Sequence, residues 1–384
     1  MSNDPTEAKK LKLLIVAPSL GILGGQAVQA ARLLSHLRSE ESLLVELLPV
    51  NPQLPGVLHQ LQKIKYVRTA VTSLAYILSL LWRVPQFDVL HIFSASYFSF
   101  VLAPTPAILI GRLYGRKVLL NYHSGEALDH LQRWRSAIST LKLAHSFIVP
   151  SEYLVEIFAR FNLKPKAIFN QIDINRFHFR ERSSLRPLFL SNRNLESHYG
   201  VDKVLRAFAL IQKEIPDARL RVVGDGSQRR SLEKLAADLG LTNITFDGQV
   251  PTEKIADVYD GADVFLNGSE IDNQPLSLLE AFASGLPIVT TDAGGIPYIV
   301  TDRVSGMLVP CGDYVQMAQR AIELLSDPQL VTRIVENGRH ECSRYSWDIL
   351  RDEWMKEYTR LGNLKGASSE STQELSSGSA SRNG

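Results

Sequence analysis

The chain has 384 residues, enough for two domains of ordinary size with well-filled cores. Its hydrophobic share of 45% and its charged share of 21% are those of a soluble globular protein. The net charge of +2 is too small to predict a nucleic-acid partner. The two cysteines, Cys311 and Cys342, have no metal-ligand spacing, so neither a disulfide framework nor a zinc site is expected. A reducing, cytoplasmic setting fits this cysteine usage best.

Both ends of the chain are polar. Residues 1–10 contain no secretory signal and are expected to be disordered. Residues 362–384 are rich in Ser and Gly and hold too few apolar side chains to fold, so a disordered tail is expected there.

A long helical region is expected over residues 55–82. Its longest apolar run, 71–82, is too short to span a bilayer, which needs roughly 20 apolar residues. The region is also basic, through Lys63, Lys65, Arg68 and Arg83. Such a helix either packs against the first sheet or lies on an anionic membrane surface, and both interpretations stay open.

Strands and helices alternate along the rest of the chain, which predicts mainly parallel sheets with helices on both faces. The alternation stops in the polar segment 174–187 and then restarts. The expected fold is therefore α/β, with two Rossmann-like, doubly wound domains at 11–173 and 188–344 facing across a cleft. The strands are expected at 11–17, 43–50, 89–92, 117–120, 146–151 and 166–170 in the first domain and at 188–190, 218–223, 244–246, 264–266 and 288–291 in the second.

Two loops of the first domain are expected at the carboxyl edge of its sheet, where such folds bind ligands. The first, 20–26, holds Gly24 and Gly25, whose spacing is not that of a dinucleotide fingerprint. The second follows the strand 117–120 and contains His123. His123 could donate to a substrate oxygen or a phosphate, or it could be structural.

Residues 267–298 combine a polar loop, a helix, a strand and a glycine turn. The helix is expected over 276–283, directly after Pro275, and its first N–H groups suit an anionic ligand. Asp272 and Glu280, eight positions apart, could bracket a hydroxyl-rich ligand around that anion. The alternative is an ordinary core helix whose exposed side carries Glu280.

Several motifs in order resemble those of the retaining glycosyltransferases of family 4, which have the GT-B fold. The resemblance covers residues 11–358 and is strongest in the second half. The matching segments are VVGDG at 222–226, NITFDG at 243–248, DNQPLSLLEAFASG at 272–285, FNQID at 169–173 and YSW at 345–347. The last of these resembles the start of a C-terminal helix, 345–361, that crosses back to the first domain.

The resemblance implies a sugar donor of the nucleoside-diphosphate class, held mostly by the second domain, and no metal or other cofactor. Arg193 matches a phosphate-binding arginine, Glu280 a glutamate on the ribose hydroxyls and Asp272 an acid near the sugar. His123 matches a histidine near the transferred sugar, and Gly25 a glycine near the phosphates. The implied catalytic residues are thus His123, Arg193 and Asp272, and the implied donor-binding residues are Gly25, Arg193, Asn273, Gln274, Leu276, Ser277 and Glu280.

The chain departs from the family pattern at two of these positions. Asp272 stands where the family has glutamate, and Tyr199 stands where it often has a lysine beside a glycine. Arg229 or Lys203 could supply the missing cation. The implied activity is retaining sugar transfer to an unidentified acceptor, in the cytoplasm, either free or peripheral at the inner face of the membrane. The alternatives are a sugar-nucleotide-binding protein without turnover and a sugar-nucleotide epimerase or phosphorylase of the same fold.

Overall fold

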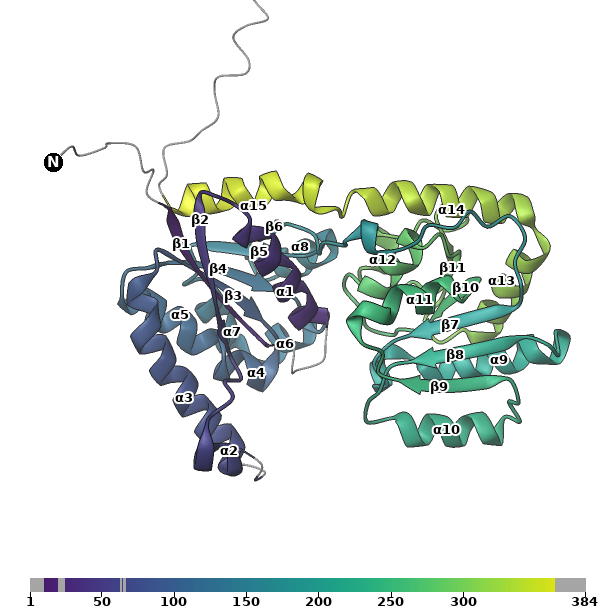
Figure 1. Cartoon of the computed structure of the whole chain (residues 1–384), viewed down its shortest axis with the longest axis horizontal. Coiled ribbons are helices and arrows are strands. Elements are labelled where there is room, and N and C mark those ends of the chain that lie inside the picture. The colour runs from purple at the N-terminus through teal and green to yellow at the C-terminus, as the bar shows by residue number, and fades with distance from the viewer. Residues whose placement is uncertain (1–9, 20–24, 63, 65–66, 363–384) are drawn as a thin grey trace, which may run out of the picture.

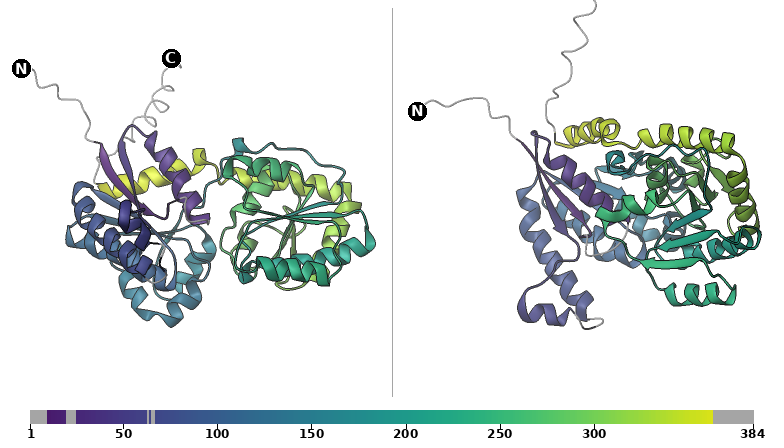
Figure 2. Two further views of the ribbon diagram at one scale, coloured as in Figure 1. Left: turned by 60° about the horizontal axis from the view of Figure 1, so that its bottom comes forward. Right: turned by 45° about the vertical axis from the view of Figure 1, so that its right-hand side comes forward.

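A computed structural model describes residues 10–19, 25–62, 64 and 67–362. The predicted polar N-terminus through residue 9, most of the loop 20–26 with Gly24, Lys63, Lys65 and the tail from residue 363 lie outside the described residues. The described chain forms two α/β domains that lie side by side (Figures 1 and 2).

The first domain is built on a parallel sheet, which in the described residues has six strands in the order β2-β1-β3-β4-β5-β6. The strands are β1 (Leu11–Ala17), β2 (Leu43–Pro49), β3 (Val89–Ser94), β4 (Lys117–Tyr122), β5 (Ser146–Val149) and β6 (Lys166–Ala167). The helices are α1 (Gly25–Arg38), α2 (Gly56–Leu61), α3 (Val67–Arg83), α4 (Tyr97–Leu102), α5 (Pro104–Leu113), α6 (Ala127–Arg133), α7 (Arg135–Leu141) and α8 (Glu152–Ala159). Buried apolar runs such as Leu13 to Ala17 form the middle strands because both faces of a parallel sheet are covered by helices.

The second domain repeats this architecture. Its parallel sheet, as far as it is described, has the order β12-β11-β10-β7-β8-β9. The strands are β7 (Leu188–Asn192), β8 (Arg219–Val223), β9 (Ile244–Gly248), β10 (Val264–Asn267), β11 (Ile288–Thr291) and β12 (Met307–Val309). The helices are α9 (Val201–Glu214), α10 (Arg229–Asp238), α11 (Ile255–Asp260), α12 (Leu276–Ala283), α13 (Tyr314–Ser326) and α14 (Pro328–Ser343). The predicted α/β class with two doubly wound domains is confirmed.

The last helix, α15 (Trp347–Gly362), lies on the first domain, and Figure 1 shows it following α14 along one edge of both domains. Leu350, Trp354 and Tyr358 of α15 share a core with strands β1 and β3. The Tyr358 hydroxyl lies 2.8 Å from Nδ1 of the buried His91 on β3. The chain therefore connects the two domains twice, first through the segment before β7 and again from α14 to α15.

Ion pairs fix the segment 180–186, which precedes β7, to the second domain. Asp263, which is buried, pairs with Arg180, Arg182 and Arg186 of this segment. Nη1 of the buried Arg182 also donates to the carbonyl oxygens of Ser284 and Gly285 at 2.6 and 2.8 Å. The predicted irregular segment is thus held against the end of α12.

Several predicted elements differ in the structure. The expected helical region 55–82 is two helices, α2 and α3, and the expected strand 166–170 has only two residues. Residues 97–106, for which no helix is predicted, form α4 and the start of α5. The apolar run judged too short for a bilayer belongs to a continuous helical segment, Val67–Gln86, whose 20 residues are long and apolar enough to cross one. Tyr76 and Leu80 on this segment are nevertheless buried in the core of the first domain.

Candidate active site

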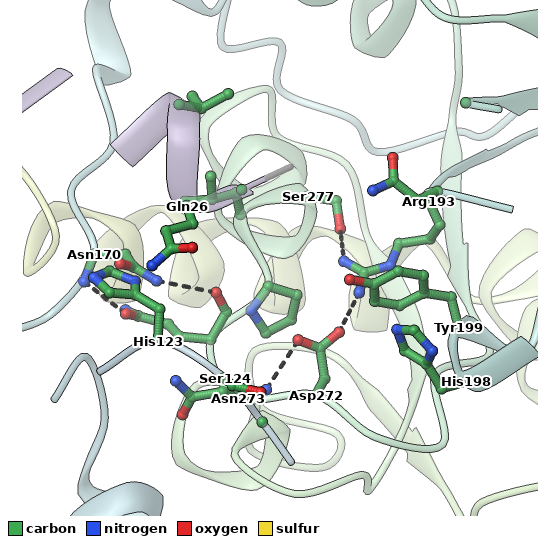
Figure 3. A pocket seen from close by; sticks show the side chains of 18 of the residues that line it. Gln26, His123, Ser124, Asn170, Arg193, His198, Tyr199, Asp272, Asn273 and Ser277 are labelled. Carbon is green, nitrogen blue, oxygen red and sulfur yellow. Dashed lines mark hydrogen bonds and ion pairs between the residues drawn. The ribbon is translucent and has the colours of Figure 1, made fainter. Parts of the chain in front are cut away.

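A cavity of about 750 Å³ lies between the two domains. The first domain contributes the start of α1, the end of β3 with α4, and the loop after β4. The second domain contributes the segments after β7, β9 and β10 and the first half of α12. Figure 3 shows Arg193, Tyr199 and Asp272 on one side of this space and Gln26 and His123 across from them. Both sheets point the carboxyl ends of their central strands at the cavity, as the sequence predicts.

Two helix N-termini meet at the cavity wall. Helix α1 begins at Gly25 and α12 begins at Leu276, and a Cβ atom at Gly25 would lie 3.8 Å from Cδ1 of Leu276. The first N–H groups of a helix have no partner within the helix, and its positive dipole end favours negative charge. Among the first N–H groups of α12, that of Leu278 is already used, because it donates to the carbonyl oxygen of Pro275 at 3.2 Å. The wall is therefore positive where the two domains meet.

Arg193 adds a fixed cation to this wall. It follows β7 directly, and its Nη1 donates to Ser277 Oγ at 3.0 Å on the first turn of α12. Its Nη2 pairs with the Asp272 carboxylate, and the Tyr199 ring lies 4.1 Å from the guanidinium carbon. Gly224, with φ of +123°, permits this placement, since a Cβ there would lie 2.0 Å from the Arg193 carbonyl oxygen.

The loop that carries Asp272 is held by a glycine turn. A Cβ atom at Gly295 would lie 2.0 Å from the Asn273 carbonyl oxygen, and the Gly295 N–H donates to the Asp272 carbonyl oxygen at 3.1 Å. The Asp272 carboxylate also accepts from the Asn273 N–H at 2.9 Å and from Ser269 Oγ at 3.2 Å. The predicted glycine turn at 294–295 therefore packs against the loop that carries Asp272 and holds it in place.

Glu280 lies at the other end of the cavity and is almost fully buried. Its carboxylate accepts from the Tyr259 hydroxyl at 3.0 Å and pairs with Arg32 of α1 at 3.4 Å. Burial raises the pKa of this carboxyl above its usual value, and Arg32 and Tyr259 offset part of that rise. Glu280 is thus a cavity residue rather than the exposed side of a core helix, which decides between the two interpretations of this helix.

Asn273 and Gln274 contact the first domain. Asn273 Oδ1 accepts from Ser151 Oγ at the start of α8, and Gln274 Oε1 accepts from the Asn170 N–H at 2.6 Å. Gln274 Nε2 is buried, and among the described residues it has no hydrogen-bond partner. The two amide oxygens therefore hold the domains together at the cavity, and Nε2 is left for another acceptor.

His123 presents a neutral ring to the cavity. Its ring stacks on Phe93 with centroids 5.0 Å apart, and its backbone N–H donates to the Ser94 carbonyl oxygen at 3.1 Å. Burial lowers the pKa of His123 to about 3, so the imidazole carries no charge near neutral pH. Its Nε2 is buried and, within the described part of the chain, makes no hydrogen bond. The ring can therefore exchange a hydrogen bond with a ligand hydroxyl.

A hydroxyl-rich rim continues from His123 along the first domain. Ser96 Oγ lies 3.0 Å from Ser124 Oγ and donates to Glu126 at 3.2 Å. Tyr97 follows with φ of +54°, a left-handed conformation that is uncommon for a bulky residue. Its hydroxyl bonds to Asp129.

The structure also adds residues that the sequence analysis did not predict. Arg32 and Tyr259 hold Glu280, and Ser96 and Tyr97 line the rim. Arg32 could have been found, because it lies on the same helical face as Gly25, Val28 and Gln29. The suggested extra cations lie elsewhere: Lys203 pairs with Asp202 and Glu270, and Arg229 pairs with Glu233.

Similarity to known proteins agrees with this geometry. Two parallel Rossmann-like domains around an interdomain site define the GT-B class of α/β proteins. HepE of Anabaena, in complex with UDP-glucose, superposes with a TM-score of 0.73 at 17% identity, over 91% of this chain and 100% of that one. Sucrose-phosphate synthase of Thermosynechococcus elongatus superposes with a TM-score of 0.76 at 19% identity, over 92% and 99%.

Sequence comparison points to the second domain. Residues 173–341 match the sequence model of the family described as Glycosyl transferases group 1. A GDP-mannose-dependent alpha-(1-6)-phosphatidylinositol monomannoside mannosyltransferase of Mycolicibacterium smegmatis is 30% identical over 208 residues, 52% of this chain and 53% of the relative. A sulfoquinovosyl transferase of Arabidopsis thaliana is 31% identical over 186 residues, 46% of this chain and 36% of the relative. The match thus spans about half or less of the length of these curated relatives.

Proposed function

We propose that the protein is a glycosyltransferase that moves a sugar from a nucleoside-diphosphate sugar to an acceptor hydroxyl. The observation that carries this proposal is the convergence of the α1 and α12 N-termini, Arg193 and Glu280 in one interdomain cavity. The first three suit a diphosphate, and a buried carboxylate suits the hydroxyls of a ribose. The length of the cavity lining, from Glu280 to the rim at Ser96, leaves space for a sugar and an acceptor beyond the diphosphate.

In the proposed reaction the bond from the anomeric carbon to the diphosphate oxygen breaks and a bond from that carbon to the acceptor oxygen forms. Charge grows on the diphosphate, where Arg193 and the helix N–H groups stabilise it. We infer a retaining, front-face course, in which the leaving phosphate oxygen takes the acceptor proton. No metal is required by this scheme. His123 would orient a hydroxyl of the transferred sugar through Nε2, and Asp272 would both hold Arg193 and lie near the sugar.

Donor binding gives the direct test. UDP-glucose and GDP-mannose are suitable probes, because the similar HepE structure holds UDP-glucose and a sequence relative is named as GDP-mannose-dependent. A cognate donor binds only the native state and should raise the melting temperature. Arg193→Ala and Glu280→Ala should each abolish transfer, and Arg219→Ala, on the exposed start of β8, is the matched control. Wild-type turnover by the Arg193 and Glu280 variants would rule out the proposed site.

Two other activities remain for comparison. Tyr199 in place of a second cation motivates a protein that binds a sugar nucleotide without turning it over; donor binding with no transfer to any acceptor extract would favour it. Sugar-nucleotide isomers or sugar phosphates formed without acceptor would instead favour an epimerase or phosphorylase.

We also infer a cytoplasmic protein that contacts the membrane peripherally. The support is the helical segment Val67–Gln86, of which one face is packed in the core and another is apolar and exposed. The surface that makes this contact follows below.

A further inference from the structure

Helix α3 and the helical turn that continues it, Val84–Gln86, have two apolar faces, and in the described part of the chain only one of these faces packs against other elements. Tyr76, Leu80 and Val84 are buried against the sheet and α5, and the Tyr76 hydroxyl donates to the Ala103 carbonyl oxygen at 2.9 Å. Leu74, Leu78 and Trp82 are 60%, 56% and 73% exposed. The two sets are offset by two residues, about 200° around a helix, so they lie on opposite sides. Burial in the core therefore cannot explain the second set.

The neighbouring helices extend this exposed apolar character. On α5, Ala107 and Gly111 are buried, whereas Leu109 and Leu113, two residues further on, are 50% and 73% exposed. On α4, Phe98 is 62% exposed. We call these exposed side chains together the α3–α5 surface: Leu74, Leu78, Leu81, Trp82, Phe98, Val101, Leu109 and Leu113.

The charge of this part of the chain is one-sided. Residues 47–125 hold seven basic residues and a single acidic one, Asp88, whereas the whole chain is nearly balanced at 42 to 40. Asp88 is half-buried and accepts from the Lys12 N–H at 3.0 Å, and of the seven basic residues Arg83 pairs with Glu46 on β2. An apolar surface in a basic surrounding fits an anionic lipid bilayer, and it would not favour a second copy of itself, because the same positive charge would face it.

The α3–α5 surface is continuous with the cavity. Tyr97, Phe98 and Ser99 line the cavity, and α4, which begins at Tyr97, joins α5 at Ala103. In Figure 1, α5 and α3 lie on the side of the first domain that is turned away from the second domain, and α4 lies nearer to the second domain. A molecule embedded in a bilayer beneath α3 and α5 would therefore reach the rim at Ser96, Ser124 and Glu126 along α4.

We propose that the α3–α5 surface docks on an anionic bilayer and that the acceptor is a membrane amphiphile whose hydroxylated headgroup enters at this rim. The acceptor part rests on the proposed glycosyl transfer; the docking part does not. The helices lie in the plane of the membrane surface, since removing α3 from the domain would expose Tyr76 and Leu80.

The test uses the full chain and vesicles of phosphatidylcholine with and without phosphatidylglycerol. Binding should be stronger on the anionic vesicles and should weaken as salt is added. The double variant Leu78→Ser, Trp82→Ser should bind at least about tenfold more weakly, because it removes two large apolar side chains from the contact. The control Ile349→Ser changes a residue of α15 that is about as exposed as Leu78, and this variant should bind as the wild type does. Brominated lipids should quench wild-type fluorescence more than that of Trp82→Phe.

The docking part would be overturned by no vesicle binding, by equal binding of the double variant, or by a dimer in solution that the double variant dissociates. Binding that resists both salt and alkaline carbonate would also overturn it, since α3 would then be inserted across the bilayer.

The donor-induced rise in melting temperature is measured on the same samples. Vesicle binding without any donor response would refute the proposed function alone, and donor response without vesicle binding would refute the docking alone. Labelled sugar from a responding donor should enter the organic-solvent phase of vesicles made from total membrane lipids; label only in water-soluble products would refute the amphiphilic acceptor.

Discussion

The guanidinium of Arg193 lies between the Asp272 carboxylate and the Tyr199 ring, whose centroid is 4.1 Å from the guanidinium carbon. Tyr199 occupies the position where the family often has a second cation. The ring instead covers one face of the first cation, and the adjacent Gly200, with φ of +58°, turns the chain so that it can do so. Asp272, Ser277 and Tyr199 thus fix this arginine on three sides.

Tyr199→Ala should therefore weaken donor binding more than Tyr199→Phe does. The contact is made by the ring face, and cation–π contacts of this kind contribute about 0.5–2 kcal/mol, or roughly two- to thirtyfold in affinity. Calorimetry with the responding nucleotide sugar measures the difference. If the two variants bound the donor equally well, the ring would not be what positions Arg193.

Gly25→Ala separates a role in ligand binding from a role in the fold. A Cβ atom there would meet Leu276 Cδ1 at 3.8 Å, which is ordinary contact. The melting temperature should therefore stay within about 2 °C of the wild-type value. Donor affinity should fall at least about tenfold, because the added methyl group stands between the two helix N-termini.

The matched variant is Gly295→Ala, where a Cβ would lie 2.0 Å from the Asn273 carbonyl oxygen. It should lower both the melting temperature and donor affinity, because the loop that carries Asp272 must shift. If Gly25→Ala left donor affinity unchanged, the phosphates would not approach α1.

The sequence predicts the second domain better than the first. The bounds of α12 and β11 were predicted to the residue, because Pro275 and Gly285 delimit a short apolar helix. The helices at 97–113 were missed, since Tyr97 begins α4 in a left-handed conformation and Pro104 begins α5 only six residues after Phe98. Local propensity gives no sign of that turn, which depends on the bond from Tyr97 to Asp129.

At the site, the sequence predicted which residues lie around the cavity but not which side chains pair with one another. Helix ends and strand ends placed Gly25, His123, Arg193, Asp272 and Glu280 around one cavity, as parallel sheets require. The pairs are long-range: Arg32 with Glu280 spans 248 positions and Asn170 with Gln274 spans 104. A single sequence holds no information on which of several cations meets which carboxylate. The roles assigned to the individual residues stay predictions.

Acid should destabilise the protein through buried histidines. Burial lowers the pKa of His91 to about 3, below its ordinary 6.5, so the unfolded state binds the proton more readily. This contribution to stability is fully present above pH 6.5 and is lost as pH falls toward 3, by about 1.4 kcal/mol per pH unit. His91→Asn should make the slope of unfolding free energy between pH 6 and 4 shallower by about that amount in urea titrations.

His340→Asn, on the exposed face of α14, is the control and should leave the slope unchanged. His91→Asn will also cost stability at pH 7, since the bond to the Tyr358 hydroxyl is altered. The slope is therefore the readout, and an unchanged slope would show that His91 is protonated in the native state.

Arg32 and Glu280 join the two domains at the cavity, and both side chains are only 10% exposed. Arg32→Ala should lower the free energy of unfolding by about 3 kcal/mol at pH 8, because it leaves a buried carboxylate with Tyr259 as its remaining partner. The pKa of Glu280 is already raised by burial and should rise further without Arg32. The loss should therefore be smaller at pH 5, where the variant's carboxyl takes up a proton.

Arg38→Ala, exposed on the same helix, should change stability by less than about 0.5 kcal/mol. A double-mutant cycle with Glu280→Gln should give a coupling of about 1–3 kcal/mol, and additive effects would show that the two side chains do not interact in solution.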